Sequence, residues 1–323
     1  MKNGKVLRIS VTDRCDLRCI YCMPESGVAL APSAELLTYE EIVTIARAAM
    51  RGGVRRFRLT GGEPLVRRGI ASLVAMLAQL GPDDLALTTN GLNLAAAADE
   101  LKAAGLRRVT ISLDTLRPER FEKITRRSGF GRIMEGLDAA RRAGLSPVKI
   151  NTVVIRGVND DEIEDFVRFA GREKIEVRFI ELMPTSGLSP ECKELGSWRP
   201  ALFVAGREVR ERIERTFGTL RPDAGADGVA RVFMAGKGAR IGLITPVSDP
   251  FCGGCERLRL GPEGRLKLCL FDKAGIDLLR ELREKKKKDD ELAAVFAAAF
   301  ERKMTWERGA LEFLSSDMFR IGG

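Results

Sequence analysis

Six of the seven cysteines in this 323-residue chain fall into two closely spaced groups, and thiols at such spacings are typical metal ligands. The first cysteine group is Cys15, Cys19 and Cys22, in a C-x₃-C-x₂-C pattern. The second cysteine group is Cys252, Cys255 and Cys269, in a C-x₂-C-x₁₃-C pattern. The remaining Cys192 stands apart and is expected to be a structural or loop thiol.

Three kinds of chemistry are open to the two groups. Disulfides are rare in the reducing cytoplasm, where we expect this chain to reside. Structural zinc prefers four closed ligands, whereas each group offers three thiols and the chain has no histidine to complete the set. Three thiolates on a four-iron cluster leave one iron open to a small molecule. We therefore favour iron–sulfur clusters over zinc at both groups.

The lack of histidine also limits the function. It excludes the triads of serine and cysteine hydrolases, zinc sites with histidine ligands and imidazole acid–base catalysis. The chain has no P-loop motif either, since its nearest string, at 235–238, ends in glycine where the motif needs a hydroxyl. Any phosphate group must therefore be bound by arginine and lysine side chains.

The chain is basic, with 54 Lys and Arg against 45 Asp and Glu and a formal charge of +9. Such a charge attracts any polyanion, so a nucleic-acid-binding iron–sulfur or zinc protein is an alternative to an enzyme. Aromatic residues make up only 6%, and they are not interleaved with basic residues as in single-strand binders. We therefore expect no nucleic-acid partner.

The composition is that of an ordinary globular protein, with 45% hydrophobic and 31% charged residues. Its apolar runs, such as Leu292–Phe300, fall well short of a membrane span. The first residues do not resemble the apolar core of a signal peptide. We expect a cytoplasmic protein without a membrane partner.

Strand-like and helix-like segments alternate through the first half of the chain. Strands are predicted over 6–11, 56–60, 86–89, 109–113, 148–154 and 177–182, and helices over 39–52, 69–79, 94–104, 130–143 and 160–172. This alternation indicates a parallel sheet, curled into a partial barrel or left open, with its chemistry at the carboxyl ends of the strands. The first cysteine group, the Gly-Gly-Glu-Pro segment at 61–64, Asn90-Gly91 and Asp114 all follow predicted strands.

A stretch rich in Pro, Gly and Ser at 183–206 predicts a boundary between a first domain, 1–183, and a second, 184–323. Beyond it we predict a helix over 207–217, strands over 230–235 and 239–244, the second cysteine group and terminal helices. The lysine run 285–288, beside two aspartates, is interpreted as a solvated helix end and not as a binding patch.

The motifs resemble one known family. The first cysteine group, with Tyr21 before its last member, resembles the radical S-adenosylmethionine (SAM) signature, and Thr-Gly-Gly-Glu-Pro at 60–64 resembles the glycine-rich turn of that superfamily. Six further segments are Val-Thr-Asp-Arg-Cys at 11–15, Tyr-Cys-Met-Pro at 21–24, Ser-Leu-Asp at 112–114, Arg-Phe-Ile-Glu at 178–181, Phe-Cys-Gly-Gly-Cys at 251–255 and Ile-Gly-Gly at 321–323. Together they resemble, more narrowly, the GTP 3′,8-cyclase family of molybdenum cofactor biosynthesis. The resemblance runs nearly end to end. It implies an α/β fold: an incomplete (β/α)₆ TIM-type barrel with a smaller C-terminal α+β domain that carries a second iron–sulfur cluster.

The resemblance also implies a set of ligands. It implies two [4Fe-4S] clusters, one on each cysteine group, with SAM as the second cofactor and GTP as the substrate. SAM would be bound by Tyr21 (through its backbone), Gly62, Ser112 and Met183. GTP would be bound by Arg8, Arg58, Thr88, Lys149, Arg257, Leu258 and Arg259. Catalytic roles are expected for Arg8, Arg257, Arg259, Gly322 and Gly323.

Electrostatics favour two of these residues independently of the resemblance. Arg257 and Arg259 lie two residues apart on an expected strand, so their side chains project to the same side. Two planar guanidinium groups there suit the oxygens of a triphosphate, which carries about four negative charges.

The implied reaction converts GTP into (8S)-3′,8-cyclo-7,8-dihydroguanosine 5′-triphosphate. The 5′-deoxyadenosyl radical removes the 3′ hydrogen of the ribose, and the sugar radical then attacks C8 of the guanine. The second cluster is expected to contact the guanine, and whether it also supplies an electron stays open. The implied partners are a low-potential electron donor and a downstream cyclic pyranopterin monophosphate synthase, with the protein as a monomer or a homodimer.

Two further points bear on this interpretation. The chain departs from the family at Asp16, where asparagine is more frequent, and a carboxylate there could alter hydrogen bonding in the cysteine loop. The nearest rival enzyme is a radical SAM maturase that modifies peptides. It would be expected to carry more C-terminal cysteines and a peptide-docking extension, and the sequence shows neither.

Overall fold

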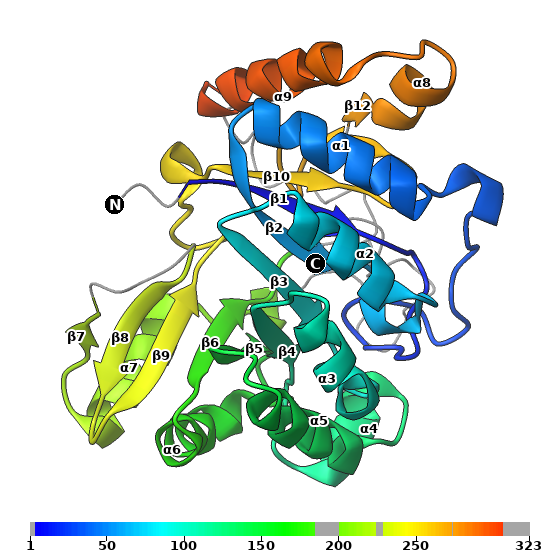
Figure 1. The fold of residues 1–323 in the computed structure, drawn as a ribbon. Coiled ribbons are helices and arrows are strands. Elements are labelled where there is room, and N and C mark those ends of the chain that lie inside the picture. Colours follow the sequence, from blue (N-terminus) through cyan, green and yellow to red (C-terminus); the bar gives the residue numbers. More distant parts are fainter. Residues whose placement is uncertain (1–3, 185–199, 224–228, 273, 306–323) are drawn as a thin grey trace.

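Six strands alternate with helices in the first half of the protein, whose computed structural model describes residues 4–184, 200–223, 229–272 and 274–305 (Figure 1). The strands are β1 (Lys5–Ser10), β2 (Val54–Thr60), β3 (Asp84–Thr89), β4 (Arg108–Ser112), β5 (Val148–Val154) and β6 (Glu176–Glu181). Each pairs in parallel with the next in chain order. The predicted parallel arrangement is confirmed.

The helices of this half are α1 (Tyr39–Arg51), α2 (Ile70–Gln79), α3 (Leu94–Ala103), α4 (Pro118–Thr125), α5 (Phe130–Arg142) and α6 (Ile163–Glu173), with 3-10 turns η1 (Ser33–Glu35), η2 (Pro64–Val66) and η3 (Asp160–Glu162). A capping box, in which Thr38 and Glu41 bond each other's backbone, starts α1. From the sequence we predict no helix at α4. This helix has only 8 residues and buries only Phe121, Ile124 and Thr125, so its apolar pattern is too short to stand out in the sequence.

The second half adds the helices α7, α8 and α9 and extends the same sheet with further strands. Its elements are η4 (Pro200–Leu202), α7 (Gly206–Phe217), β7 (Arg221–Pro222), β8 (Arg231–Ala235), β9 (Ala239–Ile244), η5 (Cys252–Gly254), β10 (Arg257–Leu260), β11 (Arg265–Lys267), β12 (Ile276–Asp277), α8 (Leu278–Arg283) and α9 (Asp289–Met304). The lysine run lies between α8 and α9, where Lys285 and Lys287 pair with Glu281.

One sheet therefore joins the two halves, in the order β12-β11-β10-β1-β2-β3-β4-β5-β6-β9-β8-β7. Late strands flank the six-stranded core on both sides, since β10 pairs in parallel with β1 and β9 pairs in parallel with β6. Among the described residues the sheet ends at β12 and β7 and does not close on itself, which agrees with the expected incomplete barrel. Figure 1 shows α9 alongside α1. The end of α1 packs closely on α9, because a Cβ on Gly52 would lie only 2.7 Å from the Cβ of Phe296.

The side chains of the core strands alternate in character. On β1, Leu7 and Ile9 are fully buried in the apolar core, while Arg8 faces the barrel interior. On β2, Phe57 and Leu59 take the same places, with Arg58 between them. The apolar residues hold the helices against the outside of the sheet, and the interior is left to polar and charged groups. None of the described helices is both long and apolar enough to cross a membrane.

Candidate active site

A cavity of about 250 Å³ opens at the carboxyl ends of the core strands and extends between them into the barrel. Both cysteine groups line it, although they lie at opposite ends of the sequence. Of the other predicted site residues, the cavity wall contains Arg8, Tyr21, Gly62, Thr88, Ser112, Met183, Arg257 and Arg259. The two sets of thiols and the two predicted binding sets thus meet in one place.

The first cysteine group lies on the loop that follows β1. The loop is held by its own backbone: the amide of Cys22 donates to the carbonyl of Cys19 at 2.9 Å, and the amide of Leu17 donates to Cys15 Sγ at 3.4 Å. Burial raises the pKa of Cys15 to about 12 and raises the pKa of Cys19 well above its ordinary value. Such thiols become thiolates when a metal coordinates them.

The Gly-Gly turn after β2 packs directly on this loop. A Cβ on Gly62 would lie 2.3 Å from the carbonyl oxygen of Arg14, and one on Gly61 would lie 2.8 Å from that of Thr12. The amides of Gly62 and Glu63 donate to the same two carbonyls at 2.7 Å each. The glycines are therefore required for close contact with the cysteine loop, and this contact also places Gly62 on the cavity wall.

Glu63 lines the cavity but was not among the predicted site residues. Its buried carboxylate accepts from Leu65 N at 2.9 Å, from Thr89 Oγ1 at 2.7 Å and from Asn90 N at 2.6 Å. Burial outweighs these bonds and raises the pKa of Glu63 to about 7. The sequence could have pointed to Glu63 as a site residue, because it directly follows the two glycines.

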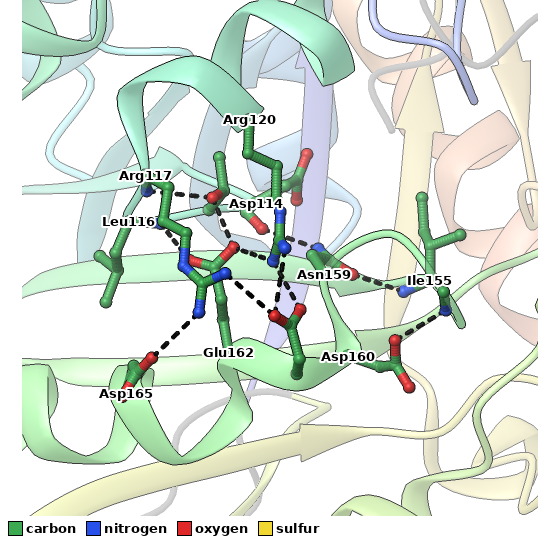
Figure 2. Close-up of polar contacts among 12 residues, drawn as sticks. Asp114, Leu116, Arg117, Arg120, Ile155, Asn159, Asp160, Glu162 and Asp165 are labelled. Carbon is green, nitrogen blue, oxygen red and sulfur yellow. Dashed lines mark hydrogen bonds and ion pairs between the residues drawn. The ribbon is translucent and has the colours of Figure 1, made fainter.

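Asp114, at the end of β4, is a second cavity carboxylate that was not predicted as a site residue (Figure 2). Its Oδ2 accepts from the hydroxyl of Tyr21 at 2.6 Å, and its Oδ1 accepts from Val153 N at 2.8 Å. Its carbonyl oxygen accepts from Asn159 Nδ2 at 2.7 Å. Burial raises the pKa of Asp114 to about 6. The residue ties the first cysteine loop to the barrel strands.

A buried carboxylate supports the segment that follows Asp114. Glu162 is fully buried; it accepts from Thr115 Oγ1 at 2.6 Å and from Leu116 N at 2.7 Å. Its charge is balanced by Arg120, 2.5 Å away, which also binds Asp161 (Figure 2). Glu162 therefore fixes the loop after β4 from the side away from the cavity, and this keeps Asp114 and Thr115 on the cavity wall.

Three arginines line the opposite part of the wall. Arg8 on β1 lies directly across from Arg259 on β10, and Arg257 lies one inward-facing position away. Burial, and then the neighbouring arginines, hold the pKa of Arg8 well below its ordinary value and lower that of Arg259 to about 9. Cations that repel one another in a buried cavity are stabilised when an anion binds between them. This wall therefore suits a polyanionic ligand.

Arg58 and Lys149, both predicted GTP ligands, are not on the cavity wall. Arg58 lies beside Arg8 in the β1–β2 register, and burial together with Arg108 and Arg178 lowers its pKa to about 9. Lys149 Nζ lies 3.3 Å from Glu176 Oε2 deeper in the barrel. Arg58 and Lys149 belong to a group of charged side chains that we call the charged layer beneath the cavity. Its other members are Arg108, Arg178, Glu176 and Arg240.

Two further predictions concern Leu258 and the end of the chain. Leu258 is fully buried in the apolar core, since it faces the opposite side of β10 from Arg257 and Arg259. Its side chain therefore does not line the cavity, and a contact between Leu258 and GTP could come only from its backbone and stays a prediction. Gly322 and Gly323 lie outside the described residues, as does Cys192.

The second cysteine group faces the cavity from the C-terminal part of the chain. Burial alone would raise the pKa of Cys255, but Arg257, Lys303 and Arg259 outweigh it and lower that pKa below its ordinary value. Lys303, buried on α9, also donates its Nζ to the carbonyl of Leu268, next to Cys269. Lys303 was not predicted, because nothing in the local sequence marks α9 as part of the cavity.

The thiols fit iron–sulfur clusters in kind and in number. Each group offers three thiols to the same cavity, and none of the six is in a disulfide. Within the described ranges, no three Cys, Asp or Glu side chains are gathered tightly enough to hold a single metal ion. A four-iron cluster binds three thiolates through three different iron atoms, so it does not require them to converge on one point.

Comparison with known proteins agrees with this arrangement. The model of the Radical SAM superfamily matches residues 9–170, and that of Molybdenum Cofactor Synthesis C matches residues 175–307. The GTP 3′,8-cyclase of Moorella thermoacetica is 46% identical over 297 residues, which are 91% of this chain and 89% of that protein. The chain belongs to the GTP 3′,8-cyclase family. Radical SAM membership implies a [4Fe-4S] cluster and SAM as cofactors.

Other relatives of the GTP 3′,8-cyclase family extend over nearly all of the chain. The GTP 3′,8-cyclase of Peptoclostridium acidaminophilum is 42% identical over 98% of this chain and 95% of that protein. The crystal structure of methylornithine synthase matches with a TM-score of 0.51 at 19% identity, and covers 66% of this chain and 62% of that one. The last match shows that the fold is shared.

Proposed function

We propose that the protein converts GTP into (8S)-3′,8-cyclo-7,8-dihydroguanosine 5′-triphosphate, in the first step of molybdenum cofactor biosynthesis. The observation that carries this proposal is the meeting of two three-thiol groups and three arginines, two of them buried, around one cavity. A cluster site, a second cluster site and a polyanion site in one cavity are what a SAM-dependent reaction on a nucleoside triphosphate requires.

The first cysteine group would hold a [4Fe-4S] cluster, and the second would hold another. When bound, the first cluster and SAM supply the one-electron chemistry that starts the reaction. The chain's own part is to position SAM against that cluster, with the backbone of Tyr21 and with Gly62, Ser112 and Met183 on the cavity wall. The bond from Tyr21 to Asp114 holds this part of the loop in place.

The triphosphate of GTP would lie against Arg8, Arg257 and Arg259, where negative charge relieves the repulsion between guanidinium groups. Thr88 lines the same cavity. Arg58 and Lys149 would act from the layer beneath, by adding positive charge behind the arginines. The guanine would then point toward the second cysteine group in the region we assign to the second domain, 184–323.

The cavity also provides an environment for reactive species. Apolar side chains form part of its wall, among them Ile180, Phe251, Leu270 and Phe271. Such walls exclude water, which limits side reactions of reactive intermediates. Reduction to the dihydro product requires a low-potential electron donor, and the product would pass to a cyclic pyranopterin monophosphate synthase in the cytoplasm. The terminal Gly322-Gly323 pair would complete the site.

The test is an anaerobic incubation of the iron-loaded protein with SAM, a strong reductant and each of the four common ribonucleoside triphosphates in turn. We expect 5′-deoxyadenosine and a cyclised nucleotide with GTP only, and neither from a variant whose first cysteine group is replaced by alanine. Absence of cyclised product with GTP, while a peptide or another nucleotide is modified, would overturn the proposal.

A further inference from the structure

Asp16 lies in the first cysteine loop, directly after Cys15, and its carboxylate binds two amide side chains. Asn90 Nδ2 donates to Asp16 Oδ1 at 2.6 Å, and Asn93 Nδ2 donates to Asp16 Oδ2 at 3.0 Å. Both asparagines belong to the segment between β3 and α3, on the neighbouring part of the site. The carboxylate therefore connects two loops that are distant in the sequence.

The side-chain oxygen of each asparagine accepts a hydrogen bond from elsewhere, and this determines that the NH₂ group is the one that faces Asp16. Asn90 Oδ1 accepts from Leu92 N at 3.0 Å, and Asn93 Oδ1 accepts from Arg132 Nη2 at 2.9 Å. Both asparagines must therefore direct an NH₂ group toward residue 16. A side chain there needs two acceptors and no donor, which an ionised carboxylate provides. An asparagine would place its own NH₂ group against one of theirs.

The connection reaches the cavity through Asn90. This residue is buried, lines the cavity and donates its backbone amide to Glu63 Oε2 at 2.6 Å. Glu63 in turn donates its own backbone amide to the carbonyl of Arg14, one residue before Cys15. A closed path of hydrogen bonds thus runs from Asp16 through Asn90 and Glu63 back to the cysteine loop.

We propose that Asp16 is a positioning residue that fixes the first cysteine group relative to the Gly-Gly turn and Asn90, and thereby shapes the SAM site. This inference rests on the proposed function for the identity of the ligand. The proposal explains why this chain has a carboxylate where the family more often has asparagine. The side-chain amides of Asn90 and Asn93 both donate to residue 16, so this residue must accept two hydrogen bonds.

The test is an exchange of the acid and the amide. Asp16→Asn places two NH₂ groups together, and Asn93→Asp places two carboxylates together. The double variant Asp16→Asn with Asn93→Asp restores every bond, because residue 16 then accepts from Asn90 and donates to residue 93, which still accepts from Arg132. The double variant also keeps the net charge of the parent. Asp99→Asn, on the exposed side of α3, removes one charge outside the network and is the control.

We expect each single variant to weaken SAM binding by about tenfold, the loss of roughly one charge-assisted hydrogen bond, and the double variant to bind within about twofold of the parent. GTP affinity should stay unchanged in all variants, since its arginines lie on β1 and β10. The electron paramagnetic resonance signal of the first cluster should respond to added SAM in the parent and the double variant, and only weakly in the single variants.

The proposal is overturned if Asp16→Asn binds SAM like the parent, or if the double variant binds no better than the weaker single variant. Should a single variant not fold, a folded double variant with parental SAM affinity still establishes the exchange, and an unfolded one refutes it. Unfolding free energies of the four iron-free proteins report the same coupling without SAM. A parent that binds no SAM but shows this coupling would refute the proposed function and leave the network standing.

Discussion

Glu176 is the carboxylate on which the charged layer beneath the cavity depends, and Glu176→Gln removes its charge with almost no change in shape. The side chain is 3% exposed on β6. Its Oε1 accepts from Arg178 Nε, and its Oε2 lies 3.3 Å from both Lys149 Nζ and Arg240 Nε. The substitution leaves three cations around a neutral amide.

The expected cost follows from this burial. Removing one partner of a buried ion pair typically costs about 3–5 kcal/mol, because the remaining charge is left uncompensated. Unfolding entropy near 2.1 cal/mol/K per residue gives about 0.7 kcal/mol/K for the 323-residue chain. Dividing the two predicts that Tm falls by about 4–7 °C in the absence of ligand.

The assay is thermal unfolding of the iron-free protein, with Glu173→Gln as the matched control. Glu173 also binds two arginines, Arg141 and Arg172, but at the end of α6, where its side chain is 24% exposed. Such a surface pair contributes less than about 1 kcal/mol. Added GTP should stabilise Glu176→Gln more than the parent, because the triphosphate supplies the missing negative charge above the same layer.

The pH dependence gives a second check. Burial alone would raise the pKa of Glu176, but Arg178, Lys149 and Arg240 together hold it below the ordinary 4.5. Its contribution is therefore fully present above pH 4.5 and is lost as the pH falls through the lowered pKa, so parent and variant should converge in acid. Equal Tm values at pH 7, or an identical GTP response, would refute the assigned role of this carboxylate.

Three further predictions concern the site itself. Replacing the second cysteine group with alanine should halve bound iron, from about eight to about four atoms per chain, and stoichiometric zinc in the parent would contradict both clusters. Arg257→Ala or Arg259→Ala should weaken GTP binding about ten- to a hundredfold, roughly 1.5–3 kcal/mol, without loss of SAM binding; an equal loss of both would make these arginines supports of the second cysteine group. Deleting Gly322 and Gly323 should lower product formation at least about tenfold, or 1.4 kcal/mol in barrier, with iron content and GTP affinity kept, and a parental rate would show that the pair is dispensable.

The parts of the fold that local sequence encodes were predictable. Alternating apolar segments located β1 to β6, and glycine at positions such as Gly52 marked where helices end. The cysteine spacing identified six thiols that line the cavity. The same two-residue alternation that directs Arg257 and Arg259 into the cavity also turns Leu258 away from it, so its buried place could have been predicted from the strand period.

Long-range pairing is what local sequence did not reveal. Nothing near β10 indicates that it lies in parallel beside β1, and nothing in α9 indicates that Lys303 reaches the cavity. The bonds from Asn90 and Asn93 to Asp16 likewise join segments that only the folded sheet brings together. Arg58 and Lys149 do not line the cavity, although the strand register sets them level with Arg8 and Thr88, which do. Local sequence does not reveal the direction that such long side chains take inside the barrel.

The pairing of β1 with β10 has a consequence for biosynthesis of the chain. β1 leaves the ribosome before β2 to β12, yet one of its two edges is completed only by residues 257–260, which are made much later. Until then a strand with open hydrogen-bonding groups is exposed, and such edges favour aggregation. Nascent chains stalled before Arg257 should therefore require chaperones far more than full-length chains do. Because β10 also carries Arg257 and Arg259, the pairing that completes this edge of β1 also brings the three cavity arginines together.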